Sequence, residues 1–248
     1  MDVRPAAGWW VALRPAATAY PRQRLLVLPH SGAGPNSYRP LLTGLPDDVE
    51  VRGLNLPGRE RRLGERPGCT VADVVASLGE LADDVPSAVF GHSLGALLGV
   101  WVARELGSRC TALIVSGQVP GVRPRFRHRA PTEAEMIGLL ELGDVPLPAA
   151  LYRPRWRRVL LGTLSADLRL GAEATEFTGV RLDVPLTVLM GAEDRMVDHA
   201  LVPWWAEHTS AECDVHVLPG GHFAVLAPEN RDAVAELLGI RTGVPAPA

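Results

Sequence analysis

Lysine is absent from the sequence, and all 25 basic residues are arginine. Because 28 acidic residues oppose them, the net charge is −3, too small to indicate nucleic acid or a membrane as the main partner. Cys69, Cys110 and Cys213 are widely spaced and odd in number, so neither a CxxC motif nor a disulfide framework is present and a reducing cytoplasm fits best. No signal peptide is indicated, and no apolar run approaches the roughly 18 residues of a membrane span.

What the sequence does contain is an alternation of short apolar runs, each ending in a turn cluster, with stretches of helical spacing. Such alternation indicates a mainly parallel sheet covered on both faces by helices. The 248 residues are 47% hydrophobic, enough for one sizeable core, so we expect a single domain over 1–248. The predicted strands are 24–29, 49–54, 87–91, 111–117, 186–191 and 214–220, and the predicted helices are 70–85, 96–106 and 228–240.

The alternation of predicted strands and helices is interrupted between about 120 and 180, where no clear strand is found. PTEAEMIGLLELG and PRWRRVLLGTLSADLRLG both have helical character. Thr132 can cap the first of them, with Glu135 three residues on to complete a capping box. We therefore interpret 120–180 as a helical insertion.

The pentapeptide GHSLG, residues 91–95, fits the pattern G-x-S-x-G. A predicted strand leads in and a predicted helix leads out, which is typical of a nucleophile elbow, where a serine on a strained turn points its hydroxyl off the sheet edge. The glycines fit because a Cβ there would clash with the neighbouring strand and helix. Ser93 is therefore the predicted nucleophile, and an ordinary strand–helix turn with a buried serine is the alternative.

A serine nucleophile needs a base, and the base needs an orienting acid. After such an elbow they follow in the order serine, acid, histidine, each on a loop after a strand. His222 directly follows the last predicted strand, whereas His208 precedes it and His216 lies inside it. Asp194 follows the strand before and is favoured as the acid; Asp198, which can instead cap a following helix, is the second candidate.

The oxyanion of an acyl-transfer reaction needs two preorganised N–H donors. One is expected to be the backbone N–H of Leu94, immediately after the nucleophile and at a helix start. The other is expected from Ser31, which follows His30 in the loop HSGAGPN after the first predicted strand. A plain glycine-rich turn is the other interpretation of that loop.

Together these stretches resemble the stand-alone (type II) thioesterases of polyketide and nonribosomal peptide synthesis. The resemblance runs over nearly the whole chain. By position, the family's nucleophile, acid and base fall on Ser93, Asp194 and His222, and its oxyanion donors on Ser31 and Leu94. The matching segments are RLLVLPHSGAGPNSYRPL, LNLPGRERR, AVFGHSLGALLGVWVAREL, LSADLRL, MGAEDRMV and LPGGHFAVL.

The resemblance implies an α/β-hydrolase fold with a mostly parallel central sheet and a helical lid at about 120–180. It implies hydrolysis of acyl thioesters from the phosphopantetheine arm of an acyl or peptidyl carrier protein, the usual role being to clear misprimed or stalled units from a synthase. It implies no metal or organic cofactor, and no metal-ligand spacing is present. One departure from the family is Ser-Gly-Ala at 31–33 where Ala-Gly-Gly is usual, which adds a hydroxyl and a methyl group near the pocket.

Two sets of residues in the insertion are candidates for substrate contact. Apolar residues there would line the acyl pocket or simply pack the lid on the body. Arginines there would dock an acidic carrier protein or form a solvated face. The pocket candidates are Met136, Leu139, Leu140, Leu160 and Leu164, and the docking candidates are Arg123, Arg125, Arg127, Arg155 and Arg158.

Two other functions stay open from the sequence. A carboxylesterase-type serine hydrolase acting on small oxygen esters would share the triad, so that only substrate preference separates it from a thioesterase. A receptor or scaffold without turnover would keep the fold, but an intact serine–acid–histidine set argues against it.

Overall fold

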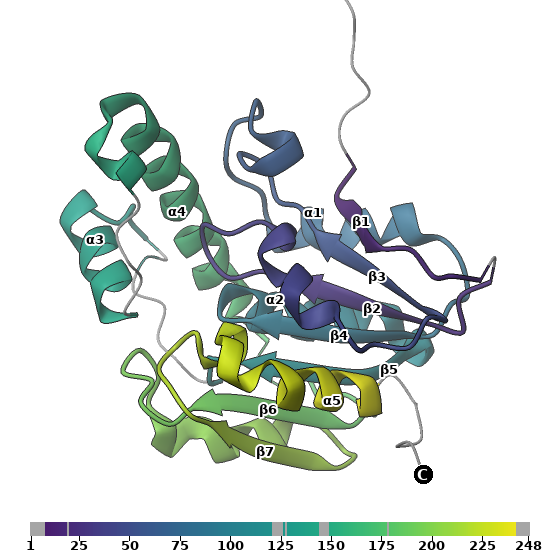
Figure 1. Ribbon diagram of the computed structural model, residues 1–248. Coiled ribbons are helices and arrows are strands. Elements are labelled where there is room, and N and C mark those ends of the chain that lie inside the picture. Colours follow the sequence, from purple (N-terminus) through teal and green to yellow (C-terminus); the bar gives the residue numbers. More distant parts are fainter. Residues whose placement is uncertain are drawn as a thin grey trace, which may run out of the picture.

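The fold is built on one seven-stranded sheet with the strand order β1-β3-β2-β4-β5-β6-β7 (Figure 1). The structure, a computed structural model, describes residues 8–18, 20–120, 126, 128–143, 149–177 and 179–241. β1 is antiparallel to β3, and the other neighbouring strands are parallel, which confirms the predicted sheet. The strands are β1 Trp10–Arg14, β2 Gln23–Leu28, β3 Val49–Leu54, β4 Ser87–His92, β5 Cys110–Ser116, β6 Leu186–Gly191 and β7 Cys213–Leu218.

The middle of each central strand is apolar because both of its faces are covered by a core. In β2, Leu26 and Leu28 belong to one core and Leu25 and Val27 to the other. Parallel strands buried in this way are continuous hydrophobic runs rather than alternating ones. This explains why runs such as RLLVL were recognisable as strands in the sequence.

Helices cover both faces of the sheet (Figure 1). α1 (Val71–Ala76) and α2 (Leu94–Leu106) contribute to the core on one face. α5 (Arg231–Arg241) and the 3-10 helix η1 (Pro35–Leu42) contribute to the core on the other. Among the residues with described coordinates, no helix is both long enough and apolar enough to span a membrane.

Two elements differ from the sequence predictions. β1 was not predicted, since it is a five-residue edge strand without a clear apolar period. The predicted helix 70–85 is regular only over α1 and continues as a 3-10 helix over Ser77–Leu81. The Ser77 hydroxyl donates to the carbonyl of Val74 at 2.6 Å, a local bond that competes with the regular helical pattern.

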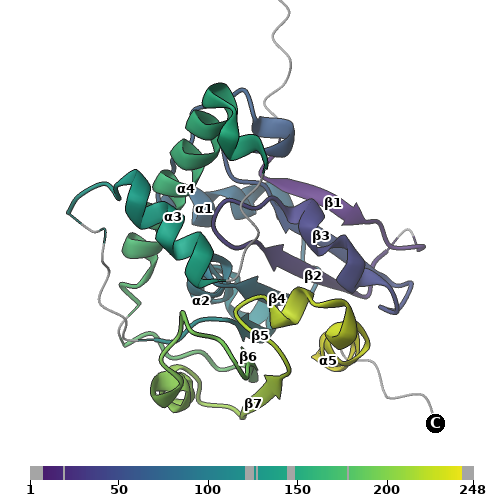
Figure 2. The same cartoon turned by 60° about the vertical axis from the view of Figure 1, so that its left-hand side comes forward.

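The segment between β5 and β6 is helical where it is described, as predicted. It contains α3 (Glu133–Leu142), the 3-10 helix η5 (Ala149–Tyr152) and α4 (Pro154–Ala174). The capping box of Thr132 and Glu135 is present at the start of α3. Figures 1 and 2 show α3 and the N-terminal part of α4 standing beyond the ends of the strands rather than against a face of the sheet.

Candidate active site

Ser93 occupies the turn between β4 and α2, as the motif predicted. Its φ of 55° and ψ of −114° lie in a region that non-glycine residues rarely adopt. A Cβ on Gly91 would collide with the carbonyl oxygen of Gly95, and a Cβ on Gly95 would collide with that of Leu28 in β2. The two glycines are therefore required by the close approach of three elements, which holds the strained serine at the carboxyl end of the sheet.

Asp194 and His222 form a buried pair at the same end of the sheet. They lie on the loops after β6 and β7, and the N–H of Ala192 ties these loops together by donating to the carbonyl of Leu218 at 2.8 Å. His222 Nδ1 lies 2.9 Å from Asp194 Oδ2, and the two side chains are 4% and 0% exposed. With Nδ1 donating to the carboxylate, Nε2 is the nitrogen available to act as a base.

A cluster of rings brings this pair to the serine elbow. The ring of His222 lies 5.0 Å from that of His92, the residue before Ser93. Phe223 packs edge-on against His222, His92 and His30, with centroid distances of 5.0, 5.3 and 4.8 Å. His92 is thus a packing partner of His222, and His30 packs in turn against His92 and Phe223.

Burial controls the charges in this cluster. It opposes ionisation of Asp194, but the hydrogen bond and charge of His222 outweigh it, so the pKa of Asp194 lies below its ordinary value. Burial, reinforced by the charges of His222 and Arg59, lowers the pKa of His30 to about 3. Burial also holds the pKa of His92 well below 6.5. Near neutral pH the site therefore combines an ionised carboxylate with two neutral imidazoles.

The predicted oxyanion donors lie on the expected elements. Leu94 is the first residue of α2, where the backbone N–H has no intrahelical acceptor. Ser31 lies in the loop after β2, and within the described residues no acceptor binds its N–H. The next N–H, that of Gly32, donates to Asp167 Oδ2 at 2.6 Å.

Arg59 and Asp167, to which the sequence analysis gave no role, form an ion pair beside this loop. A signal for Asp167 was present in the sequence, because the residue shares the buried face of α4 with Thr163, Leu164 and Leu170. A carboxylate at that register needs a partner. One sequence alone does not say which of the 25 arginines supplies it.

A mainly apolar cavity of about 260 Å³ lies between the oxyanion loop and the helical segment. Three of the pocket candidates, Leu140, Leu160 and Leu164, line it. Met136 does not, because it is buried in a small cluster that packs α3 against α4, and Leu139 is also absent from the wall. The lining residues are His30, Ser31, Gly32, Ala33, Leu140, Leu151, Leu160, Leu161, Leu164 and Phe223.

A larger cavity, of about 530 Å³, runs along the C-terminal half of α4. Its wall is more polar and includes Cys69, Arg169 and Glu173, but neither Ser93 nor His222. In the described parts of the chain, no cluster of three or more histidine, cysteine or acidic side chains is arranged to hold a metal ion. Ser93 and His222 are also absent from the wall of the smaller cavity. That wall does include His30 and Phe223, whose rings pack against the ring cluster at the serine elbow, so the smaller cavity is the one associated with the elbow.

The predicted docking arginines are only partly described. Arg155 and Arg158 line a groove of about 430 Å³ together with Arg66, which the sequence analysis did not single out. None of these three pairs with an acidic side chain within the described residues. Three of the predicted residues lie outside the described part of the chain: Arg123, Arg125 and Arg127.

A serine elbow at the carboxyl end of a mostly parallel sheet, with a buried aspartate–histidine pair on the loops of later strands, defines the molecule as an α/β-hydrolase. The model of the thioesterase domain family matches residues 23–241. The chain belongs to this family, which confirms the resemblance read from its motifs.

Individual relatives extend this finding. AMB antimetabolite synthetase AmbE of Pseudomonas aeruginosa is 33% identical over 86% of the chain, although the chain spans only 10% of AmbE. RedJ, a thioesterase from the prodiginine biosynthetic pathway in Streptomyces coelicolor, superimposes with a TM-score of 0.78 at 29% identity, covering 96% of each chain. BorB, the type II thioesterase from the borrelidin biosynthetic cluster, gives a TM-score of 0.77 at 27% identity, covering 94% of this chain and 97% of its own.

Proposed function

We propose that the protein is a serine thioesterase that hydrolyses acyl thioesters held on the phosphopantetheine arm of a carrier protein. The observation that carries this proposal is the buried hydrogen bond between His222 and Asp194 beside the strained Ser93. Membership of the thioesterase family and the likeness to RedJ and BorB support a biosynthetic thioester over a simple oxygen ester.

The first half of the proposed reaction forms an acyl-enzyme. Ser93 Oγ attacks the thioester carbonyl carbon while His222 Nε2 takes the hydroxyl proton, and Asp194 stabilises the imidazolium. The N–H groups of Ser31 and Leu94 donate to the developing oxyanion, each contributing about 2.7–4 kcal/mol. The C–S bond then breaks, the proton passes from His222 to the leaving sulfur, and the acyl group remains as an ester on Ser93.

The second half releases the acid. His222 removes a proton from a water molecule whose oxygen attacks the acyl carbon. The ester C–O bond breaks, and Ser93 Oγ recovers a proton from the imidazolium. These steps use only this chain's own residues and water, so the proposal includes no metal or organic cofactor.

The apolar cavity supports a short or medium acyl group as the substrate. Its volume of about 260 Å³ is slightly below the usual range of ligand pockets, about 300–1,000 Å³. Leucines of α3 and α4 form much of its wall, so we propose the segment between β5 and β6 as a lid over the acyl chain. A small pocket favours the removal of short, misprimed units from a polyketide or nonribosomal peptide synthase over the release of its finished product.

We propose that the groove containing Arg66, Arg155 and Arg158 docks the carrier protein. Arginines on an open groove, here without an acidic partner among the described residues, attract acidic surfaces and increase the rate of encounter. The acidic residue on the wall, Glu65, is itself paired with Arg62 and so opposes this attraction weakly.

The proposed location is the cytoplasm. The three cysteines are unpaired in the structure, and burial raises the pKa of the Cys110 thiol to about 12. Thiols of this kind stay in the unreactive protonated form.

The activity is tested by offering wild type and Ser93→Ala a panel of acyl-carrier proteins, acyl-N-acetylcysteamine thioesters and matched oxygen esters. We expect wild type to release free acids from the thioesters, with short chains turned over faster, and Ser93→Ala to release none. Faster turnover of the oxygen esters than of every thioester would make the protein a carboxylesterase. Absence of Ser93 labelling by a fluorophosphonate probe would remove the case for any serine hydrolase.

The docking groove is tested by reversing two charges, Arg155→Glu with Arg158→Glu. Reversing Arg104 and Arg231, on α2 and α5, gives a control with the same net charge. We expect kcat/KM for carrier-bound substrates to fall at least about tenfold in the groove variant only, and less at high salt, because exposed charges are screened. Equal losses with carrier-bound and N-acetylcysteamine thioesters would show that the groove does not dock the carrier.

A further inference from the structure

A buried ion pair joins three separate segments of the chain next to the oxyanion loop. Arg59 comes from the loop after β3 and Asp167 from α4, and both side chains are nearly inaccessible, at 6% and 3% exposed. Arg59 Nη2 lies 2.6 Å from Asp167 Oδ1, and Nη1 lies 2.7 Å from Oδ2. The same Oδ2 accepts the N–H of Gly32, and the same Nη1 donates to the carbonyl of Ala33 at 3.0 Å. A planar guanidinium and a carboxylate in this bidentate arrangement fix both distance and direction.

The ion pair determines which N–H group of the loop is available to a substrate. The N–H of Gly32 is used by Asp167, and the N–H of Ala33 donates to the carbonyl of His30 at 3.1 Å. Gly32 has a φ of +82°, a left-handed conformation that turns these successive N–H groups in different directions. What remains is the N–H of Ser31, one residue from the anchored Gly32 and on the wall of the acyl cavity.

We propose that Arg59 and Asp167 are positioning residues of the oxyanion hole: they hold the 30–33 loop so that the Ser31 N–H points at the reacting carbonyl. The inference rests on the proposed function, because it presumes acyl transfer at Ser93. Neither residue lines the cavity, so they act through the loop and not by contact with the acyl group.

The same contacts link the loop to the helix that lines the acyl pocket. Asp167 is three residues beyond Leu164, which lines the cavity, on the same helix α4. Thr163 strengthens the link, since its hydroxyl lies 3.3 Å from the carbonyl of Gly58, next to Arg59. A movement of α4 therefore carries the carboxylate that orients the oxyanion donor, so acyl-chain binding and oxyanion geometry are coupled.

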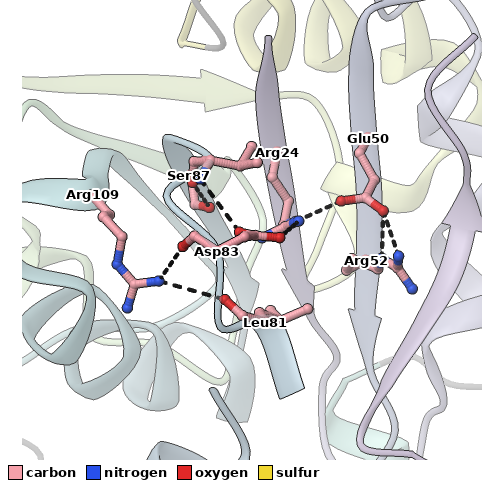
Figure 3. A network of polar contacts seen from close by, with 8 residues as sticks. Arg24, Glu50, Arg52, Leu81, Asp83, Ser87 and Arg109 are labelled. Carbon is pink, nitrogen blue, oxygen red and sulfur yellow. Dashed lines mark hydrogen bonds and ion pairs between the residues drawn. The ribbon is translucent and has the colours of Figure 1, made fainter. Parts of the chain in front are cut away.

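The test compares Asp167→Asn with Glu50→Gln. Glu50 also holds a buried arginine, Arg24, but at the opposite end of the sheet, in the network shown in Figure 3. Both changes remove one carboxylate charge with little change of shape, so the second controls for general loss of stability. The rate of Ser93 labelling by a fluorophosphonate and kcat/KM for an acyl-N-acetylcysteamine thioester are measured at a temperature where circular dichroism shows both variants folded.

We expect Asp167→Asn to slow labelling and lower kcat/KM by about 10–100-fold, since complete loss of an oxyanion donor costs about 10²–10³. Glu50→Gln should stay within twofold of wild type. Two inhibitors separate positioning from general damage. An alkyl boronic acid, whose tetrahedral adduct places an oxygen in the oxyanion hole, should bind Asp167→Asn more weakly by the same factor. A thioether analogue without a carbonyl should bind as it does to wild type.

Labelling and kcat/KM within twofold of Glu50→Gln would overturn the inference, and so would an equal loss of boronic acid and thioether binding, which would place the damage in the acyl pocket. If Asp167→Asn does not fold, Arg59→Lys replaces it, because lysine keeps the charge but loses the bidentate geometry. The labelling comparison does not need a thioester. A wild type that labels but hydrolyses no thioester would contradict the proposed function and still test this inference.

Discussion

An arginine is buried at each end of the sheet, but its charge is compensated by a different number of carboxylates at the two ends. At the amino end, Arg24 bonds both Glu50 and Asp83, and Asp83 is half-exposed to solvent; Figure 3 shows how Arg52 and Arg109 extend the network. At the carboxyl end, Asp167 is the single acidic partner that Arg59 has among the described residues, and both are buried. The amino-end network is redundant and partly exposed, whereas the carboxyl-end pair is single, buried and joined to the loop of the proposed oxyanion hole.

This difference indicates what each arrangement can contribute to the molecule. A shared, partly exposed network tolerates the loss of one member, because another carboxylate remains. A lone buried pair is weak evidence for stability, since apolar residues of the same size often serve as well. Its presence beside Ser31 is therefore better explained by the direction it imposes on the loop. The predictions below separate the two ends by matched substitutions.

Asp194→Asn should give the largest effect. The amide cannot hold His222 in the tautomer that leaves Nε2 as a base, so we expect kcat to fall about 10⁴-fold. Asp83→Asn makes the same change at the amino end and should leave kcat within twofold. Asp198→Asn tests the second acid candidate. Asp198 caps the 3-10 helix that begins at His199, and asparagine caps about as well as aspartate, so this change should alter stability little and leave catalysis intact. A larger fall in kcat for Asp198→Asn than for Asp194→Asn would reverse the assignment.

Chain order and local motifs were sufficient to predict which loops meet at this candidate site. β3 and β6 match their predicted bounds, and Ser93, Asp194 and His222 follow from the sequence serine–acid–histidine on loops after strands. These features are local, because each depends only on the sequence of one strand and of the turn that follows it.

The Arg59–Asp167 pair could not be predicted in this way, because its partners are 108 positions apart and belong to different elements. The same reason explains the missed role of His92, which depends on packing against the loop that carries His222. The edge strand β1 was missed because its pairing with β3, and not its own five residues, defines it. A single sequence shows which side chain needs a partner but not which partner it finds.

The free energies of unfolding should also differ between the two ends. Asp167→Asn leaves Arg59 buried without a counter-charge, which should cost about 3–5 kcal/mol. Glu50→Gln leaves Arg24 paired with Asp83 and should cost about 1–3 kcal/mol. The double variant Arg59→Met/Asp167→Leu should recover most of the stability, because it removes both charges. Urea unfolding measures the free energy of unfolding of all three variants. An equal loss in the two single variants would show that the second carboxylate at the amino end gives no additional tolerance.

Gly117→Ala and Gly107→Ala compare the ends through backbone strain. Both glycines have positive φ, 58° and 55°, so each alanine should cost about 1–2 kcal/mol of stability. At Gly107 nothing lies within 4 Å of an added Cβ. At Gly117 the Cβ would lie 2.6 Å from His92 Cε1 and 3.1 Å from His222 Cε1. Only Gly117→Ala should therefore displace the base and lower kcat, by about 10–100-fold. Equal kcat in the two variants would mean that the rings of His92 and His222 can move away from the added Cβ without any effect on catalysis.

The dependence of stability on pH should be the smallest difference. Burial, with the nearby charges of His222 and His30, keeps the pKa of His92 well below 6.5, so the folded protein holds this imidazole neutral. Below pH 6.5 the unfolded chain binds a proton that the folded one does not. The free energy of unfolding should therefore fall with falling pH, with a limiting slope of about 1.4 kcal/mol per pH unit from this group.

At the amino end, the hydrogen bond from Arg24 lowers the pKa of Asp83 below 3.8, so the stability contributed there is lost only at more acidic pH. Urea unfolding between pH 7.5 and 5 should show a flatter slope for His92→Gln than for wild type and an unchanged slope for Asp83→Asn. If Asp83→Asn flattens the slope instead, the protons that destabilise the fold in this range bind at the amino end. Burial of the neutral His92 imidazole at the carboxyl end would then not be the cause of the loss of stability at lower pH.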